Sequence, residues 1–203
     1  MGTPKVKPPG GRTAAVVCAG ICAFLALLAP QPMLPMLARS FRVSAAAASL
    51  VITASTTAVA LGAPFAGMVG DRFGRKRVMV PSAFLLAVPT FLAATSNTLG
   101  QLLFWRFVQG IFTPGVFVVT LAYVNEEWTE GAGAAVSAYV TGTVIGGFSG
   151  RMLSGWVAAY TSWRWTFIVL GILNTLGAVA IWRFLPAGSK FIRGARGAGT
   201  LRP

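Results

Sequence analysis

Long stretches without any charged side chain dominate the pattern of hydrophobic and polar positions. Residues 13–38, 43–70 and 78–105 contain no Asp, Glu, Lys or Arg. Each stretch exceeds the about 20 apolar residues that a helix needs to cross the hydrocarbon core of a bilayer. The first stretch is too long, and begins too far along the chain, for the core of a signal peptide. The pattern predicts an integral membrane protein that retains its first hydrophobic helix.

Six membrane-spanning helices are expected, separated by prolines, turn residues and short polar clusters. Pro30, Pro32 and Pro35 should break the first helix near its end, and Ser44 is a suitable N-cap for the second. The predicted helices cover about 14–37, 45–69, 78–95, 99–124, 133–159 and 166–184. The sequence therefore predicts an all-α integral membrane fold.

The cations indicate how these helices are oriented. Three Lys or Arg precede residue 13, four lie in 70–77 and five follow residue 182, whereas the opposite side has only Arg39, Arg42 and Arg164. Lys and Arg are enriched in cytoplasmic loops. We therefore expect a multi-pass protein of the plasma (inner) membrane with both termini in the cytoplasm.

This orientation divides the chain into three parts. A cytoplasmic N-terminal lead at 1–13 precedes a six-helix transmembrane domain at 14–186, and a basic cytoplasmic tail follows at 187–203. Lead and tail are rich in Gly, Pro and cations, which is typical of segments that do not build a packed core.

Composition narrows the possible functions. Hydrophobic residues make up 55% of the chain and charged residues 10%, where a soluble domain has about a quarter. The cations that give the chain its net charge of +13 cluster between the hydrophobic spans. The expected partner is therefore the lipid bilayer, and no nucleic acid is expected. The chain has no histidine, and Cys18 and Cys22 alone make no metal site. We expect no enzyme activity, no catalytic residue, no cofactor and no metal.

The segment between the second and third helices has a distinctive spacing, Gly-Met-Val-Gly-Asp-Arg-Phe-Gly-Arg-Lys-Arg at 67–77. Gly67 is expected to end a helix where backbones approach, Gly74 to permit a tight turn, and Asp71 to offset four cations in this loop. The spacing closely resembles the signature of the major facilitator superfamily at this place, Gly-x-x-x-Asp-Arg-x-Gly-Arg-Lys.

In that family the acidic residue helps to hold the two halves of the transporter together at the cytoplasmic side and is released when the protein changes state. The resemblance implies a conformational-switch loop made of Gly67, Gly70, Asp71, Arg72, Gly74, Arg75 and Lys76. The alternative is an ordinary positively charged cytoplasmic loop with a turn glycine. Cations alone fit that alternative, whereas the complete spacing with Asp71 favours the switch.

Two arginines fall inside predicted helices. Arg106-Phe-Val-Gln109-Gly110 is similar to the family's Arg-x-x-Gln-Gly element in the fourth helix. An arginine within a span is costly and normally faces a cavity or a partner, so Arg106, Gln109 and Arg151 are candidates for a substrate or coupling site. The alternative for both arginines is that they extend to the outer interface, since each lies near the outer end of its helix.

The fifth predicted helix carries Gly142, Gly146, Gly150 and Ser154 at four-residue spacing, so that one face is nearly bare backbone. Such a face allows close helix packing, which is the role we assign to it. Some efflux members of the family have a Gly-rich fifth-helix motif ending in Gly-Pro. Gly146-Gly147 replaces that Gly-Pro here, so the motif does not assign the chain to the antiporter branch.

Further similarities extend the resemblance over 14–186. Ser162-Trp-Arg-Trp-Thr-Phe167 is similar to the family's entry into the sixth helix, and the proline break at 31–35 also fits. The resemblance implies half of a major facilitator fold, built as two inverted three-helix repeats, and leans toward sugar- and multidrug-efflux permeases. The four acids all lie at the cytoplasmic edge, so this half has no buried carboxylate to carry a coupling proton.

The expected function is therefore transport of a small-molecule substrate by alternating access, of the efflux type. In the family, substrate lies between two six-helix halves, and the chain stops where the linker between them is expected. We expect the second and fifth helices to face a missing C-terminal half or a second copy of the chain. The alternatives are a truncated, non-transporting fragment and a regulatory membrane protein that kept half of a transporter fold.

Overall fold

The computed structural model describes residues 10–128 and 131–185, and every regular element within them is a helix. The expected all-α class is confirmed. The expectations for residues 1–9 and for the tail at 187–203 lie outside the described residues. The elements are α1 (Gly10–Leu25), the 3-10 turn η1 (Gln31–Met33), α2 (Leu34–Phe41), α3 (Ala45–Phe73), α4 (Arg75–Ala94), α5 (Leu99–Glu127), α6 (Ala132–Tyr160) and α7 (Trp163–Phe184).

The first hydrophobic segment differs most from the prediction. A helix was expected to run to about residue 37, but α1 ends at Leu25 and helical structure resumes only at η1. The prolines explain the early end: Pro30 has no N–H to donate to the carbonyl of Ala26, and Pro32 has none for Leu28. The break therefore begins one turn before the first proline, and it leaves main-chain carbonyls without helical partners.

The other helices lie close to their predicted positions. The caps of α3 and α5 are side-chain oxygens: Ser44 Oγ accepts from the Ala47 N–H at 3.1 Å, and Thr98 Oγ1 from the Gln101 N–H at 3.2 Å. Both helices extend a few residues beyond the expected ends, to Phe73 and Glu127. The expected ends were placed where the apolar runs stop. A helix can continue past that point into water, because its backbone hydrogen bonds are made within the helix.

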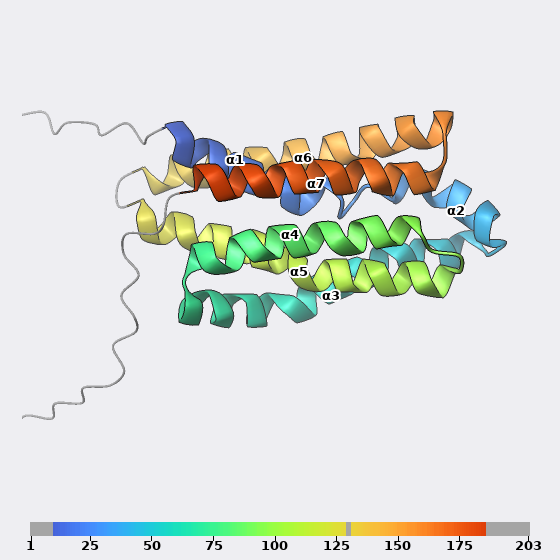
Figure 1. The fold of residues 1–203 in the computed structure, drawn as a ribbon, viewed down its shortest axis with the longest axis horizontal. Helices are drawn as coiled ribbons and strands as arrows, with labels where there is room; N and C mark the ends of the chain where they lie inside the picture. Colours follow the sequence, from blue (N-terminus) through green and yellow to red (C-terminus); the bar gives the residue numbers. More distant parts are fainter. Residues whose placement is uncertain (1–9, 129–130, 186–203) are drawn as a thin grey trace, which may run out of the picture.

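The long helices lie side by side along one axis (Figure 1). The turn between α3 and α4 and the end of α5 lie at one end of the bundle, which we call the Gly74 end. The α4–α5 and α6–α7 turns lie at the other end, the Thr161 end. The main packing pairs are α3 with α5, α1 with α6, α4 with α5, α4 with α7 and α1 with α7. α1 and α5 therefore occupy the middle of the bundle.

The outer surface is apolar, as expected for a bundle in lipid. Phe65, Phe148, Met152 and Trp156 are each between 63% and 67% exposed. Among the described helices, α3, α4, α5 and α7 are long and apolar enough to cross a membrane. α1 is apolar but shorter, and the Gly-rich α6 does not meet the same criterion.

Candidate functional site

Two polar clusters connect the helices, and the first lies at the Gly74 end. The expected loop at 70–77 is wrong: α3 continues to Phe73 and α4 begins at Arg75, so that Gly74 alone separates them. Gly74 has a φ of 96°, a value that L side chains rarely adopt. The tight turn expected at Gly74 is confirmed, and it brings the end of α3 beside the start of α4.

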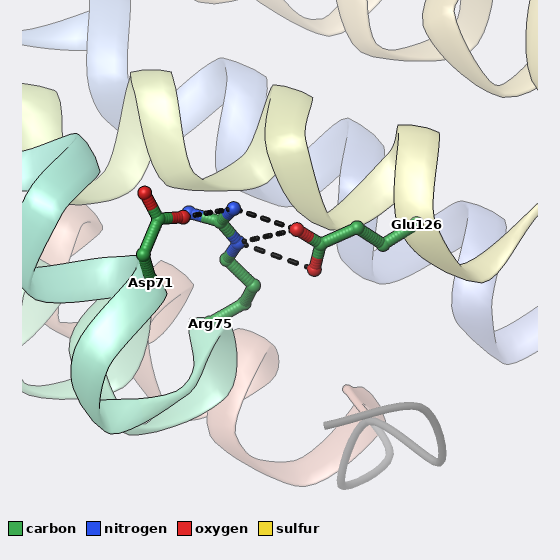
Figure 2. A network of polar contacts seen from close by, with 3 residues as sticks. All are labelled: Asp71, Arg75 and Glu126. Atoms are coloured by element: carbon green, nitrogen blue, oxygen red, sulfur yellow. Dashed lines mark hydrogen bonds and ion pairs between the residues drawn. The ribbon is translucent and has the colours of Figure 1, made fainter. Parts of the chain in front are cut away.

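Arg75 lies between two carboxylates, Asp71 of α3 and Glu126 of α5 (Figure 2). Its Nη2 donates to Glu126 Oε1 at 2.6 Å, and its Nε lies 3.1 and 3.2 Å from the two Glu126 oxygens. Its Nη2 also pairs with Asp71. We call Asp71, Arg75 and Glu126 the Arg75 network. It joins α3, α4 and α5 by charge.

The Arg75 side chain is only 14% exposed, whereas Asp71 and Glu126 are 65% and 51% exposed. Gly70 explains how the arginine fits, because a Cβ there would lie 2.9 Å from Arg75 Nη1. The absence of a side chain at Gly70 thus makes room for the guanidinium. Ion pairs with exposed partners contribute about 0.2–1 kcal/mol, so the network forms and opens at little cost.

The other residues of the predicted switch take different positions. Among the described residues, the ion pairs at this end involve Arg75 alone, so Asp71 does not offset all four cations. Arg72 lies over the Phe73 ring, and Lys76 is half-buried. Gly67 was expected to end a helix, which is wrong because α3 continues past it. A Cβ at Gly67 would meet nothing within 4 Å.

The second cluster surrounds Arg106, whose side chain is fully buried inside the bundle. A guanidinium has five N–H donors, and each of them has an acceptor here. Nε donates to Val51 O at 3.4 Å, Nη1 to Ala26 O at 2.9 Å and to Gln109 Oε1, and Nη2 to Leu27 O at 2.7 Å and Ser55 Oγ at 2.9 Å. We call these groups the Arg106 cluster.

The break after α1 accounts for two of these bonds. The last carbonyls of a helix have no partner within the helix and carry a partial negative charge. Ala26 and Leu27 lie directly after the last residue of α1, and both carbonyls accept from Arg106. Arg106 therefore stabilises the broken first segment from the neighbouring α5.

Gln109 and Gly110 complete the pattern that the sequence singled out. Gln109 Oε1 accepts from Arg106, and its Nε2 donates to Thr90 Oγ1 of α4 at 3.0 Å. A Cβ at Gly110 would lie 2.3 Å from Ser55 O, so α3 reaches the arginine only because residue 110 is glycine. The Arg-x-x-Gln-Gly spacing thus joins α5 to α1, α3 and α4.

The structure separates the three residues that we grouped as a substrate or coupling site. Arg106 and Gln109 lie together in the interior, so Arg106 does not extend to the interface in this structure. Arg151 is exposed on α6, where it donates to Gly147 O and Gln31 Oε1. Arg106 and Arg151 have no partner in common among their hydrogen bonds. A role of any of the three in substrate binding stays a prediction.

The small-residue face of α6 packs against α1 inside the chain. A Cβ at Gly142, Gly146 or Gly150 would lie 2.0 to 2.5 Å from a carbonyl oxygen of α1. Ser154 Oγ donates to Ala29 O at 2.6 Å, just beyond the end of α1. This face was also expected to meet a missing half, which is wrong because α1 already covers it. The outward face of α6 presents large apolar side chains instead, among them Val144.

An apolar groove of about 560 Å³ lies between α1, α6 and α7. Cys18, Cys22, Phe148 and Trp156 are among the residues that line it, and no charged residue does. Arg106, Gln109 and Arg151 are not part of its lining. Its α1 wall runs from Cys18 to Leu25, and its apolar walls suit the hydrocarbon region of a bilayer.

Sequence reasoning missed several members of both clusters. Glu126 was expected only at the cytoplasmic edge, beyond the end of the fourth helix. The Gly74 turn and the end of that helix were both predicted at this side, which was a usable signal. Ser55 and Thr90 carry no sequence signal, because hydroxyl residues in a span most often bond to their own helix.

Comparison with known proteins supports a transporter fold. A profile of the Major Facilitator Superfamily matches residues 16–200. An uncharacterized transporter of Buchnera aphidicola subsp. Schizaphis graminum is 34% identical over 85% of this chain and 42% of its own length. The inner membrane transport protein YnfM of Escherichia coli K12 is 32% identical over 88% of this chain and 43% of its own length. This chain thus spans less than half the length of these relatives.

A solved structure gives the same picture of the fold. The proton:xylose symporter XylE, bound to 6-bromo-6-deoxy-D-glucose, matches with a TM-score of 0.78. The match covers 90% of this chain and 46% of XylE at 16% sequence identity. At this identity the likeness concerns the arrangement of the helices.

Proposed function

The chain belongs to the Major Facilitator Superfamily, and from this premise we propose that it forms the N-terminal six-helix half of a transporter that moves a small solute by alternating access. The match of residues 16–200 to the superfamily carries this proposal. We further propose that the direction is efflux, on the basis of the sequence resemblance to efflux permeases.

The proposed half has six membrane crossings: α1, η1 and α2 form one broken span, and α3 to α7 form the other five. The packing pairs support two equivalent three-helix units, the first ending with α4 and the second beginning with α5. If the units are equivalent, α5 corresponds to α1, α6 to α3 and α7 to α4. The α3–α5 pair then corresponds to α6–α1 and the α4–α5 pair to α7–α1, and the helices of all four pairs are in contact. α1 and α5 run in opposite directions (Figure 1), as inverted repeats require.

Glycines support the same equivalence. α6 approaches α1 through Gly142, Gly146 and Gly150, and α3 approaches α5 through Gly62 and Gly110. In each pair a Cβ would lie within 2.9 Å of a carbonyl oxygen of the neighbouring helix. Both equivalent pairs therefore depend on bare backbone at the crossing.

We place the Gly74 end in the cytoplasm, because it carries Arg72, Arg75, Lys76 and Arg77. The test uses single cysteines in a variant whose Cys18 and Cys22 are alanine. Arg77→Cys should be protected from an impermeant thiol reagent added outside the cell, and Thr161→Cys should react. Both positions are exposed at their ends of the bundle. Labelling of Arg77→Cys from outside would contradict the orientation.

A second half is required for transport in this proposal. Leu61, Phe65 and Met68 project from α3 with 54% to 64% of their surface exposed, and a second six-helix unit would bury part of this apolar face. The second unit is either a C-terminal half or another copy of the chain. Cross-linking in lipid vesicles, followed by flux measurements with a labelled sugar, a labelled dicarboxylate and a cationic dye, tests this. Flux through a demonstrated monomer would refute the proposal.

A further inference from the structure

Arg151 is an exposed cation far from any acid of the chain. It is the twentieth residue of α6 and the only charged residue between Ala132 and Tyr160. At 1.5 Å per residue it lies roughly 28 Å along α6 from the Gly74 end. The sequence has four acids. One is Asp71, and the other three lie in 126–130, before α6 begins. A cation within a span is costly unless it meets a partner or a polar cavity.

The bonds that Arg151 makes leave part of its guanidinium available. Nε donates to Gly147 O at 2.9 Å and Nη1 to Gln31 Oε1 at 3.3 Å. Two of the five N–H donors are thus occupied, and no ion pair within the described residues involves Arg151. Gln31 uses its carbonyl oxygen toward Arg151, which leaves its NH₂ group as a further donor beside the guanidinium.

No side chain lies one turn before or one turn after Arg151 on its own helix. The positions one turn before and one turn after it are Gly147 and Gly155. A Cβ at Gly147 would reach only the tip of Leu28, at 3.6 Å, and one at Gly155 only Pro32, at 3.4 Å. The break after α1 brings Gln31 across to Arg151.

From these observations we infer that Arg151 and Gln31 bind an anionic group of the transported solute, a carboxylate or a phosphate. Arg Nη2–H and Gln Nε2–H are the donors, and together they match the oxygens of such a group. Arg106 is not suited to this task, since an anion would have to displace one of its five existing bonds. The inference rests on the proposed transport function for the role of the ligand, but the binding itself is measurable without transport.

The experiment measures binding of two probes, succinate and inorganic phosphate, to the full chain by calorimetry at constant ionic strength, in nanodiscs of phosphatidylcholine. D-glucose serves as the uncharged comparison. Binding of at least one anion is expected, and Arg151→Gln should weaken it roughly ten- to hundredfold, because a charge-assisted hydrogen bond is lost. Arg151→Lys should retain part of the affinity. Arg39→Gln, which removes an exposed arginine of α2, is the matched control and should bind as the wild type does.

Three results would overturn the inference: no binding of either anion, equal affinity in Arg151→Gln and wild type, or loss of succinate and phosphate binding when part of the phosphatidylcholine is replaced by phosphatidylglycerol. The last would show that a lipid headgroup occupies the site. Failure of the proposed transport function and failure of the anion site would give different results. Anion binding that depends on Arg151, without flux in an assembly with two halves, would refute transport only. Flux of glucose that is unchanged in Arg151→Gln would refute the anion site only.

Discussion

Two arginines each join several helices, one inside the bundle and one at its Gly74 end, and they use opposite kinds of acceptor. Arg106 is fully buried, and all its acceptors are neutral oxygens: three main-chain carbonyls, an amide and a hydroxyl. Arg75 is only 14% exposed but pairs with carboxylates that are themselves more than half exposed. The interior thus relies on hydrogen bonds, and the end of the bundle on charge.

The difference shows which part of the fold is suited to change. Water cannot replace the partners of Arg106, so every bond broken there leaves a buried polar group unsatisfied. Asp71 and Glu126 exchange Arg75 for water with little loss. The Arg106 cluster is therefore expected to persist in all states of the protein, whereas the Arg75 network is suited to open and close.

Removing the buried arginine should cause the largest loss. In Arg106→Ala five acceptors lose their donor. Side-chain hydrogen bonds in membrane proteins average about 0.6 kcal/mol, so the free energy of unfolding should fall by on the order of 3 kcal/mol. Transport by a competent assembly should be abolished, and Arg106→Lys should retain some of both. Unfolding by denaturing detergent in mixed micelles gives the first quantity.

Arg151→Ala is the control for this variant, since it removes an exposed arginine that makes two hydrogen bonds on another helix. Its unfolding free energy should stay within about 1 kcal/mol of the wild type. Equal losses in the two variants would show that the interior has no special dependence on Arg106, and the contrast between the two regions would fail.

The second prediction concerns the approach of α3 to the Arg106 cluster. Gly110→Ala places a Cβ 2.3 Å from Ser55 O and 2.7 Å from the Ala58 Cβ, so the helices must move apart. Overpacking of this kind costs about 1–3 kcal/mol. Gly100→Ala on the same helix meets nothing within 4 Å and is the matched control. Thermal unfolding of the two variants in detergent provides the comparison.

The third prediction concerns the Arg75 network. Asp71→Asn and Glu126→Gln keep size and remove charge, so each should change the unfolding free energy by less than about 1 kcal/mol. In a transport-competent assembly both should nevertheless impair flux, because the network is proposed to open and close at the cytoplasmic side. Arg77→Gln removes an exposed cation outside the network and should leave flux unchanged. Wild-type flux in both Asp71→Asn and Glu126→Gln would reduce the motif to a topology signal.

The sequence predicted the helices well and the contacts between them poorly, for a physical reason. Hydrophobic runs, Ser44 as a cap and Gly74 as a turn are local features. Their energetics depend on neighbouring residues, so they are visible in one sequence. Where a long side chain finds its acceptors is not local: Arg75 reaches a residue 51 positions away, and Arg106 one 80 positions away. No periodicity records such pairs.

The early end of α1 and the role of Gly67 illustrate the same limit. The prolines were visible in the sequence. The Ala26 and Leu27 carbonyls that they leave without helical partners are satisfied because α5 brings Arg106 to them. Gly67 and Gly70 look equivalent in the motif. The structure distinguishes them, since only Gly70 faces another side chain of the chain.

That distinction gives the fourth and smallest prediction. Gly67 lies inside α3, where alanine is favoured over glycine by roughly 0.5–1 kcal/mol, and a Cβ there is unobstructed. Gly67→Ala should therefore stabilise the isolated chain slightly, whereas Gly70→Ala, whose Cβ would lie 2.9 Å from Arg75 Nη1 and 3.3 Å from Val119, should displace the arginine and stabilise nothing. Thermal unfolding in detergent distinguishes the two.

Gly67→Ala should have a different effect once a second half is present. If the glycine at 67 allows a close approach between the halves, Gly67→Ala should lower flux in the complete assembly while the isolated chain gains stability. Unchanged flux would show that nothing packs closely against Gly67 in the transporter, and the motif would then depend on Gly70, Gly74 and the Arg75 network alone.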